Sequence, residues 1–277
     1  MNFQTKLHDW VNINRLFMDE LLANPNAIEI IKKNINNPNI HYWGTLSKNP
    51  NAIELLKANP DKINWKLLSL NPNAIELLEA NPDKINWKYL SLNPNAIKLL
   101  EANPDKINWT TLSSNPNAIR LLKANPDKIV LGLLVRNPNA IDMIIENLEN
   151  LNWNENFWLS TNLNIAKLLN KKYKIPLYWF WLSGNPGAIV LLEKNISKIQ
   201  WNALSANPNA IELLKTNSNE IDYLYLSKNP NIFGYDYKKI KYYKYNERFT
   251  IFIYNIYKTK LKNIPLELLK IIFEYNE

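Results

Sequence analysis

Residues 71–92 read NPNAIELLEANPDKINWKYLSL, and the chain repeats this stretch with little change. Residues 49–70 differ from it only at Lys57 and Leu67, and NPNAI begins again at Asn93. A fixed period of this length is typical of proteins built from stacked repeats. The units begin at asparagines spaced 22 to 25 residues apart: Asn24, Asn49, Asn71, Asn93, Asn115, Asn137, Asn162, Asn185, Asn207 and Asn229. This spacing predicts nine complete units and the start of a tenth.

The repeated stretch contains two Asn-Pro steps, at Asn71-Pro72 and Asn81-Pro82. An asparagine side chain can accept an unpaired amide of the first helical turn, and proline suits the first helical position. Proline also disfavours the α conformation of the residue before it, so each step should end one helix and begin the next. We therefore expect two helices of about eight to ten residues in each unit. Helices this short are marginal in water, so neighbouring units must stabilise one another.

A leucine-rich repeat is the competing interpretation, because LLSLN resembles the strand of that repeat. It places Lys66 and Asn73 where buried leucines belong, and Pro72 directly after the strand, so we reject it. The sequence instead predicts an all-α fold: an α-solenoid of nine 22–25-residue two-helix repeats with N- and C-terminal caps. The expected division is an N-terminal cap at 1–23, the solenoid at 24–228 and a basic aromatic cap with a terminal helix at 229–277.

Composition limits the classes of function. The chain has 277 residues, 46% of them apolar, and no cysteine, which excludes disulfides and thiolate metal sites. We find no signal-peptide run and no apolar run long enough for a membrane span, so we expect no membrane association and a cytoplasmic location. The net charge is +8, of which +4 falls in residues 229–277.

Catalysis has little support in the sequence. The two histidines, His8 and His41, lack metal-ligand spacing, and no glycine-rich phosphate loop or nucleophile motif is present. The carboxylates that recur from unit to unit repeat too regularly to form a unique site. We therefore predict a protein that is not an enzyme, with no catalytic residues, no cofactor and no bound metal.

Some positions vary from unit to unit within an otherwise constant frame. They are either an unconstrained surface or the place where specificity for a protein partner is encoded. The irregular stretch from Leu148 to Ser183 adds the aromatic residues Phe157, Trp158, Tyr178, Phe180 and Trp181. The candidate partner-binding residues are Glu54, Lys66, Glu76, Lys88, Lys98, Arg120, Trp158 and Trp181.

A tryptophan recurs at one position of most units. The members are Trp43, Trp65, Trp87, Trp109, Trp153, Trp179 and Trp201, with Leu131 and Tyr223 in the two other units. Rings in a row could form a groove for an extended peptide or for nucleic-acid bases. The favoured interpretation is that they fill the core between units, because Leu131 as a replacement indicates burial.

NPNAIELLEANPDKINW (residues 71–87) and LSKNPNIFGYDYKKIK (residues 226–241) resemble uncharacterised repeat proteins of giant DNA viruses of amoebae. The resemblance covers Asn24 to about Lys241 and ends there, because the Tyr/Lys-rich tail differs from the usual family ending. It implies a viral protein, located in the host cytoplasm, and no particular activity.

The C-terminal end carries a second resemblance. Residues 264–275, IPLELLKIIFEY, look like the first helix of an F-box, although a full F-box is about three times longer. This implies an adaptor that docks to a ubiquitin-ligase component through Pro265, Leu268, Leu269, Ile272 and Phe273. An amphipathic capping helix is the plainer interpretation.

Lysines and tyrosines alternate in the tail before this helix. Lysines could bind a phosphate backbone while tyrosines stack on bases, as in single-strand binding proteins. The candidate nucleic-acid-binding residues are Lys238, Lys239, Lys241, Lys244 and Arg248. The favoured hypothesis remains a non-enzymatic scaffold for another protein, with the adaptor and nucleic-acid functions as alternatives.

Overall fold

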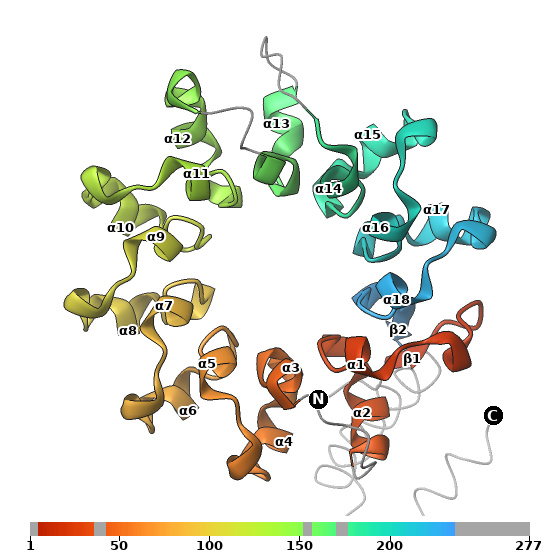
Figure 1. Ribbon diagram of the computed structural model, residues 1–277, viewed down its shortest axis with the longest axis horizontal. Helices are drawn as coiled ribbons and strands as arrows, with labels where there is room; N and C mark the ends of the chain where they lie inside the picture. Colours follow the sequence, from red (N-terminus) through yellow and green to blue (C-terminus); the bar gives the residue numbers. More distant parts are fainter. Residues whose placement is uncertain (1–4, 36–42, 152–156, 170–176, 236–277) are drawn as a thin grey trace, which may run out of the picture. The chain divides into compact units, whose positions relative to one another are not determined.

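The computed structural model describes residues 5–35, 43–151, 157–169 and 177–235 (Figure 1). Its contacts divide the chain into two compact units, Leu7–Phe233 and the combination of Met1–Lys6 with Gly234–Glu277. Apart from strand pairing at the boundary, the structure discussed below belongs to Leu7–Phe233. Short helices make up most of the described residues, so the expected all-α class is confirmed.

The regular unit contains four helical pieces. In the unit beginning at Asn93 they are η6 (Pro94–Ala96), α8 (Ile97–Glu101), η7 (Pro104–Lys106) and α9 (Trp109–Leu112). Ile107 separates the last two because its backbone is extended, with φ −63° and ψ 123°. The first expected helix is therefore present, as the continuous run of η6 and α8, whereas the second is wrong because it is divided into the 3-10 turn η7 and the one-turn helix α9.

The two asparagines of the Asn-Pro steps have different roles. The side chain of Asn93 accepts a hydrogen bond from the amide of Asn95 at 3.0 Å, which confirms the predicted N-cap. Asn103 makes no such cap, and its φ of −134° is unlike that of Asn93. Its side-chain amide instead donates to the Leu99 carbonyl at 2.9 Å, so it satisfies the end of the preceding helix.

The α-helices form two rows (Figure 1). The helices of the first row each begin at an isoleucine, and we name it the Ile row. Its members are α2 (Ile28–Asn34), α4 (Ile53–Lys57), α6 (Ile75–Glu79), α8 (Ile97–Glu101), α10 (Ile119–Ala124), α12 (Ile141–Glu146), α13 (Ile165–Leu169), α15 (Ile189–Glu193) and α17 (Ile211–Thr216).

Most helices of the second row begin at a tryptophan, and we name it the Trp row. Within Leu7–Phe233 it lies on the inner side of the curve, with the Ile row outside it (Figure 1). Its members are α1 (Met18–Leu21), α3 (Trp43–Lys48), α5 (Trp65–Leu68), α7 (Trp87–Leu90), α9 (Trp109–Leu112), α11 (Leu131–Leu134), the 3-10 helix η11 (Phe157–Thr161), α14 (Trp179–Ser183), α16 (Trp201–Ser205) and α18 (Tyr223–Leu226).

Each unit contributes the same few side chains to one continuous core. In the unit that begins at Asn71, Ala74, Leu78 and Leu90 are fully buried, and the equivalent residues of neighbouring units pack against them. A single unit has too few such side chains to form a core of its own. The stability must come from contacts between adjacent units, as in other repeat proteins.

The first asparagine of every unit is buried and joins its unit to the previous one. Asn71 donates its side-chain amide to the carbonyls of Ser47 at 3.0 Å and Asn49 at 2.8 Å. Asn93 does the same to Ser69 at 3.1 Å and Asn71 at 2.8 Å. The other unit-start asparagines repeat the pattern, and we call the series the asparagine ladder.

A buried serine forms a second connection. The Ser69 hydroxyl donates to the Trp65 carbonyl at 2.9 Å and accepts the amide of Asn86, in the next unit, at 3.0 Å. Equivalent bonds from amide to hydroxyl recur at Ser47, Ser91, Ser113, Ser160, Ser183, Ser205 and Ser227.

The ladder closes on itself. Asn24, the first member, donates to the carbonyls of Ser227 and Asn229, each at 3.0 Å. The amide of Phe17 donates to the Ser227 hydroxyl at 2.9 Å, in the same way that Asn86 donates to Ser69. The Arg15 guanidinium lies 3.8 Å from the centre of the Tyr223 ring. Residues 12–23 therefore occupy the place of the second half of the unit that begins at Asn229, and we call this contact the seam.

Two short strands lie at the ends of the described chain. β1 (Thr5–Leu7) pairs with β2 (Phe233–Tyr235), and the amide of His8 donates to the Ile232 carbonyl at 2.9 Å.

Candidate partner-binding surface

The tryptophans of the Trp row are partly covered. Each described member is half-buried against the core, and lysines of the following unit lie over several of the rings. Lys62 lies 4.8 Å from the Trp43 ring centre, and Lys128 lies 4.6 Å from that of Trp109. The rings therefore take part in the core on one side and in cation–π contacts on the other. Trp153 lies outside the described residues.

Five aromatic side chains gather on the Trp row where η11 and α14 lie side by side. The ring centres of Trp158 and Trp181 are 5.3 Å apart. Phe157 stacks on Trp181 at 5.5 Å and tilts against Trp158 at 4.5 Å. Phe180 meets Trp181 edge-on at 5.4 Å, and Tyr178 meets Phe157 edge-on at 6.2 Å. We call these five residues the aromatic cluster.

The cluster remains open to solvent although its rings pack together. Phe180 and Trp181 keep 38% and 37% of their surface exposed, a large fraction for such side chains. The Arg136 guanidinium, just after α11, lies 4.3 Å from the Trp158 ring centre. The cluster thus presents apolar rings and one cation together, a combination common at the energetic centre of protein interfaces.

The predicted residues of the Ile row do not join the cluster. Glu54, Glu76, Lys98 and Arg120 lie on the exposed face of α4, α6, α8 and α10, outside the Trp row (Figure 1). Glu54 pairs with Lys57 at 3.1 Å within its own helix, and Arg120 contacts Glu101. These are solvated pairs that contribute little stability.

The two predicted lysines of the Trp row lie on the same row as the cluster, in other units. Lys66 and Lys88 are exposed on α5 and α7, and the ammonium of Lys66 lies 5.2 Å from the Tyr89 ring centre. Of the eight partner residues predicted from the sequence, the structure brings only Trp158 and Trp181 into contact among the described residues.

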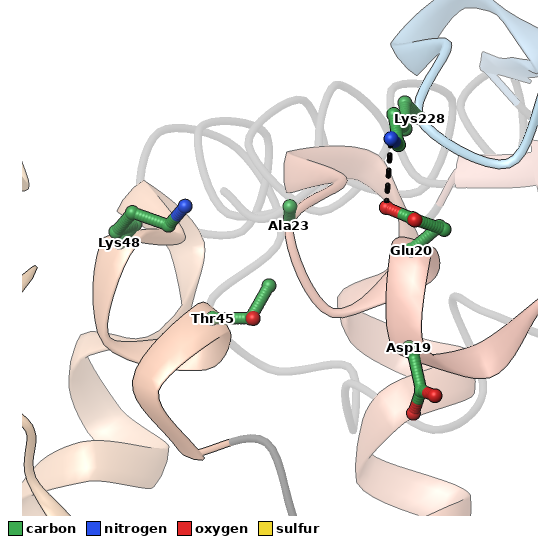
Figure 2. Close-up of a pocket in the computed structure, with 6 residues that line it drawn as sticks. All are labelled: Asp19, Glu20, Ala23, Thr45, Lys48 and Lys228. Atoms are coloured by element: carbon green, nitrogen blue, oxygen red, sulfur yellow. Dashed lines mark ion pairs between the residues drawn. The ribbon is translucent and has the colours of Figure 1, made fainter. Parts of the chain in front are cut away.

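A polar cavity of about 510 Å³ lies near the seam. Its lining residues come from α1, the turn after it, α3 and the residue before Asn229 (Figure 2): Asp19, Glu20, Ala23, Thr45, Lys48 and Lys228. Glu20 and Lys228 form an ion pair at 3.2 Å on one wall. The cavity and the aromatic cluster both lie on the Trp row, but charged residues line the cavity.

Two features were not predicted from the sequence. These are Arg136 beside the aromatic cluster, and the hydrogen bonds from the unit-start asparagines to the preceding unit. Arg136 gives only a weak signal in the repeat pattern, since the same place holds Leu70 and Leu92 in some units and the basic residues Lys48 and Lys228 in others. The ladder did leave a signal: at Asn162 the following proline is replaced by Leu163, yet the asparagine is kept. The Asn162 amide still donates to the carbonyls of Val135 at 2.8 Å and Asn137 at 3.0 Å.

Two sets of candidates lie outside the described residues. These are the adaptor-binding residues Pro265, Leu268, Leu269, Ile272 and Phe273, and the nucleic-acid candidates Lys238, Lys239, Lys241, Lys244 and Arg248. Within the described ranges, no group of three or more His, Asp or Glu residues is arranged to hold a metal ion. None of the helices described there is long and apolar enough to cross a membrane.

Comparison with protein families, curated proteins and solved structures found no match to this chain. The geometry of the surface itself must therefore support any proposal about function.

Proposed function

We propose that this chain is a non-enzymatic scaffold that binds another protein, and that its Asn-Pro units form a closed α-solenoid. In this proposal nine units are contiguous in sequence, and the tenth combines residues from Asn229 onward with residues 12–23. Cytoplasmic location and viral origin are part of the same proposal and rest on the sequence alone.

The observation that carries the proposal is the aromatic cluster. Exposing Phe180 and Trp181 to water is costly unless a partner covers them, because burial of apolar surface contributes about 25 cal/mol per Å². Tryptophan and arginine supply much of the binding energy in protein interfaces, and here Trp158, Trp181 and Arg136 lie together.

The frame beneath the cluster supports a binding role. Asn162 and Asn185 link the two units that carry the rings, and Ser160 accepts the amide of Tyr178 at 3.2 Å. A surface held in place by such bonds loses little conformational entropy when a partner binds. The variable residues on the Ile row then contribute solubility rather than contacts.

Nucleic acid is a less suitable occupant of this surface. Bases need free aromatic faces for stacking. Arg136, Phe157 and Trp181 all contact the Trp158 ring, so a base would have to displace one of them to stack there. The tail and the terminal helix, where nucleic-acid and adaptor functions were expected, lie outside this argument.

The test is affinity capture from cells that express the tagged chain, with and without Phe180→Ala and Trp181→Ala combined. We expect the double variant to lose its protein partner, because both side chains are exposed and truncating them leaves the core intact. Val190→Ala is the matched control, since Val190 is 61% exposed on the Ile row. An unchanged partner set in the double variant, or single-stranded RNA bound by the wild type and lost in the variant, would contradict the proposal.

A further inference from the structure

The two rows of helices differ in the sign of their charges. The described helices of the Trp row from α3 to α18, each taken with the two residues that follow it, contain no Asp or Glu. Their charged side chains are all basic: Lys48, Lys66, Lys88, Arg136 and Lys228. The helices of the Ile row carry carboxylates along most of their length: Glu29, Glu54, Glu76, Glu79, Glu101, Asp142, Glu146, Glu193 and Glu212. The inner row is therefore basic, whereas the outer row carries both signs.

The rows also differ in how their cations are paired. On the Ile row, Lys215 pairs with Glu212 at 2.7 Å, as Lys57 does with Glu54. On the Trp row, four cations form no ion pair with any residue that the structure describes: Lys48, Lys66, Lys88 and Arg136. Lys228 differs from these four because α1 brings Glu20 to within 3.2 Å of it. The four unpaired cations remain available to carboxylates of a partner.

These four cations lie on one side of the aromatic cluster, and we call them the basic stretch. Three of them, Lys48, Lys66 and Lys88, lie on the successive helices α3, α5 and α7. Packed helices are about 8–10 Å apart, which is close to the screening length of physiological salt, so the potentials of neighbouring lysines add. The fourth, Arg136, lies 4.3 Å from the Trp158 ring centre and so brings the stretch to the edge of the cluster.

We propose that the protein bound by this scaffold docks through an extended acidic segment with an apolar anchor. The carboxylates of the segment pair with the basic stretch, and the anchor packs on the aromatic cluster. This inference rests on the scaffold function proposed above and adds the chemistry of the partner to it. An extended chain advances about 3.3 Å per residue, so one step from helix to helix takes about three residues. Acidic residues about three positions apart therefore match successive lysines.

A nucleic-acid strand matches this surface less well than such a segment does. A strand carries a charge at every phosphate and is held by cations along its whole path. In the part of the Trp row that the structure describes, α9, α14 and α16 have no charged side chain. A partner that is charged in one part and apolar in another fits this division.

Selection from a phage library of random 16-residue peptides, with the full chain as bait, tests the inference without a known partner. We expect the selected peptides to be enriched in Asp and Glu beside a Trp, Phe or Leu, and their binding to weaken as salt rises. The most enriched peptide is then labelled and titrated by fluorescence anisotropy.

Lys66→Glu and Lys88→Glu combined should weaken binding of this peptide about tenfold, because both lysines would then repel its carboxylates. The fold should tolerate the change, since other units hold Thr110 and Gly132 at this position. Lys33→Glu and Lys123→Glu combined are the matched control. Both residues are exposed on the Ile row, the net charge changes equally, and binding should stay at the wild-type level.

Phe180→Ala and Trp181→Ala combined separate failure of this inference from failure of the scaffold proposal. Peptides that need these two rings but show no excess of Asp or Glu, or that tolerate the Lys66 and Lys88 reversal, would overturn the inference and leave the scaffold proposal standing. A selection that yields no peptide, or peptides that bind without the two rings, would overturn both. Single-stranded RNA that displaces the peptide and depends on Lys66 and Lys88 would assign the basic stretch to nucleic acid instead.

Discussion

The seam and an interior junction, such as the one between the units of Asn71 and Asn93, use the same hydrogen bonds. Asn24 and Asn93 each donate to two backbone carbonyls, and Phe17 and Asn86 each donate to a serine hydroxyl. The difference is covalent: the chain runs through the interior junction, whereas the seam joins residues more than 200 positions apart. Closure therefore depends on non-covalent contacts alone: the side-chain bonds of Asn24 and Ser227, the Arg15–Tyr223 contact and the backbone bond from His8 to Ile232.

Asn24→Asp and Asn93→Asp should have the largest effect. Each places a buried carboxylate against two carbonyl oxygens, and an unpaired buried charge costs about 3–5 kcal/mol. We expect both variants to lose a similar free energy of unfolding in guanidinium titrations, with Asn139→Asp, which is exposed, as the mild control. If Asn24→Asp costs no more than Asn139→Asp while Asn93→Asp is severe, the seam is open in solution.

Gly187→Asn should break an interior junction despite restoring the residue that other units carry. A Cβ at Gly187 would overlap the backbone carbonyl of Leu163, and overpacking costs about 1–3 kcal/mol. Gly132→Ala is the control, because its Cβ would meet nothing within 4 Å, and helix propensity should raise stability by about 0.5–1 kcal/mol. A melting temperature that falls for Gly187→Asn and rises for Gly132→Ala would support this packing. A raised melting temperature for Gly187→Asn would refute it.

Ser227→Ala and Ser69→Ala compare the second connection at the two places. Each removes the acceptor for one amide, Phe17 at 2.9 Å or Asn86 at 3.0 Å, and should cost about 1–2 kcal/mol. Hydrogen exchange should speed up at Phe17 in the first variant and at Asn86 in the second. A Phe17 amide that already exchanges freely in the wild type would show that the seam bond does not form.

Glu20→Gln and Glu101→Gln should have the smallest effect. The carboxylates are 28% and 30% exposed and their partners, Lys228 and Arg120, are 42% and 79% exposed, so solvent screens both pairs. We expect each variant to lose less than about 0.5 kcal/mol in denaturant titrations, and the loss to vanish in high salt. A larger, salt-resistant loss at Glu20 alone would mean that this ion pair helps to hold the seam.

The features that were predicted correctly are those that depend on residues close together in the sequence. The period, the all-α class and the cap at Asn93 follow from the residues beside them, and these were confirmed. The divided second helix was missed because the extended backbone at Ile107 leads into Asn108, whose amide bonds to the Ser91 hydroxyl of the preceding unit at 3.0 Å. The predicted cap at Asn103 was wrong because its side chain is turned to the preceding helix, where its amide donates to the Leu99 carbonyl at 2.9 Å and its oxygen caps nothing.

The candidate surface was harder to predict than the fold. Trp158 and Trp181 stood out as extra aromatics, whereas their contact and that with Arg136 depend on how adjacent units are aligned. The seam did have an unnoticed signal. Asn12 precedes Asn24 by the same 12 residues that separate Asn59 from Asn71, so residues 12–23 of the predicted cap have the length of a half-unit.

Closure also restricts how such a chain can change in length. An open array grows by copying one module, since either terminus accepts another. Here the two ends of the described array, residues 12–24 and 227–229, bond to each other, so one more copy of 22 residues would require every junction to adopt a slightly different angle at once. The near-identical copies between Asn49 and Arg136 indicate that the array grew by duplication. The bonds between its two ends now disfavour further growth of this kind.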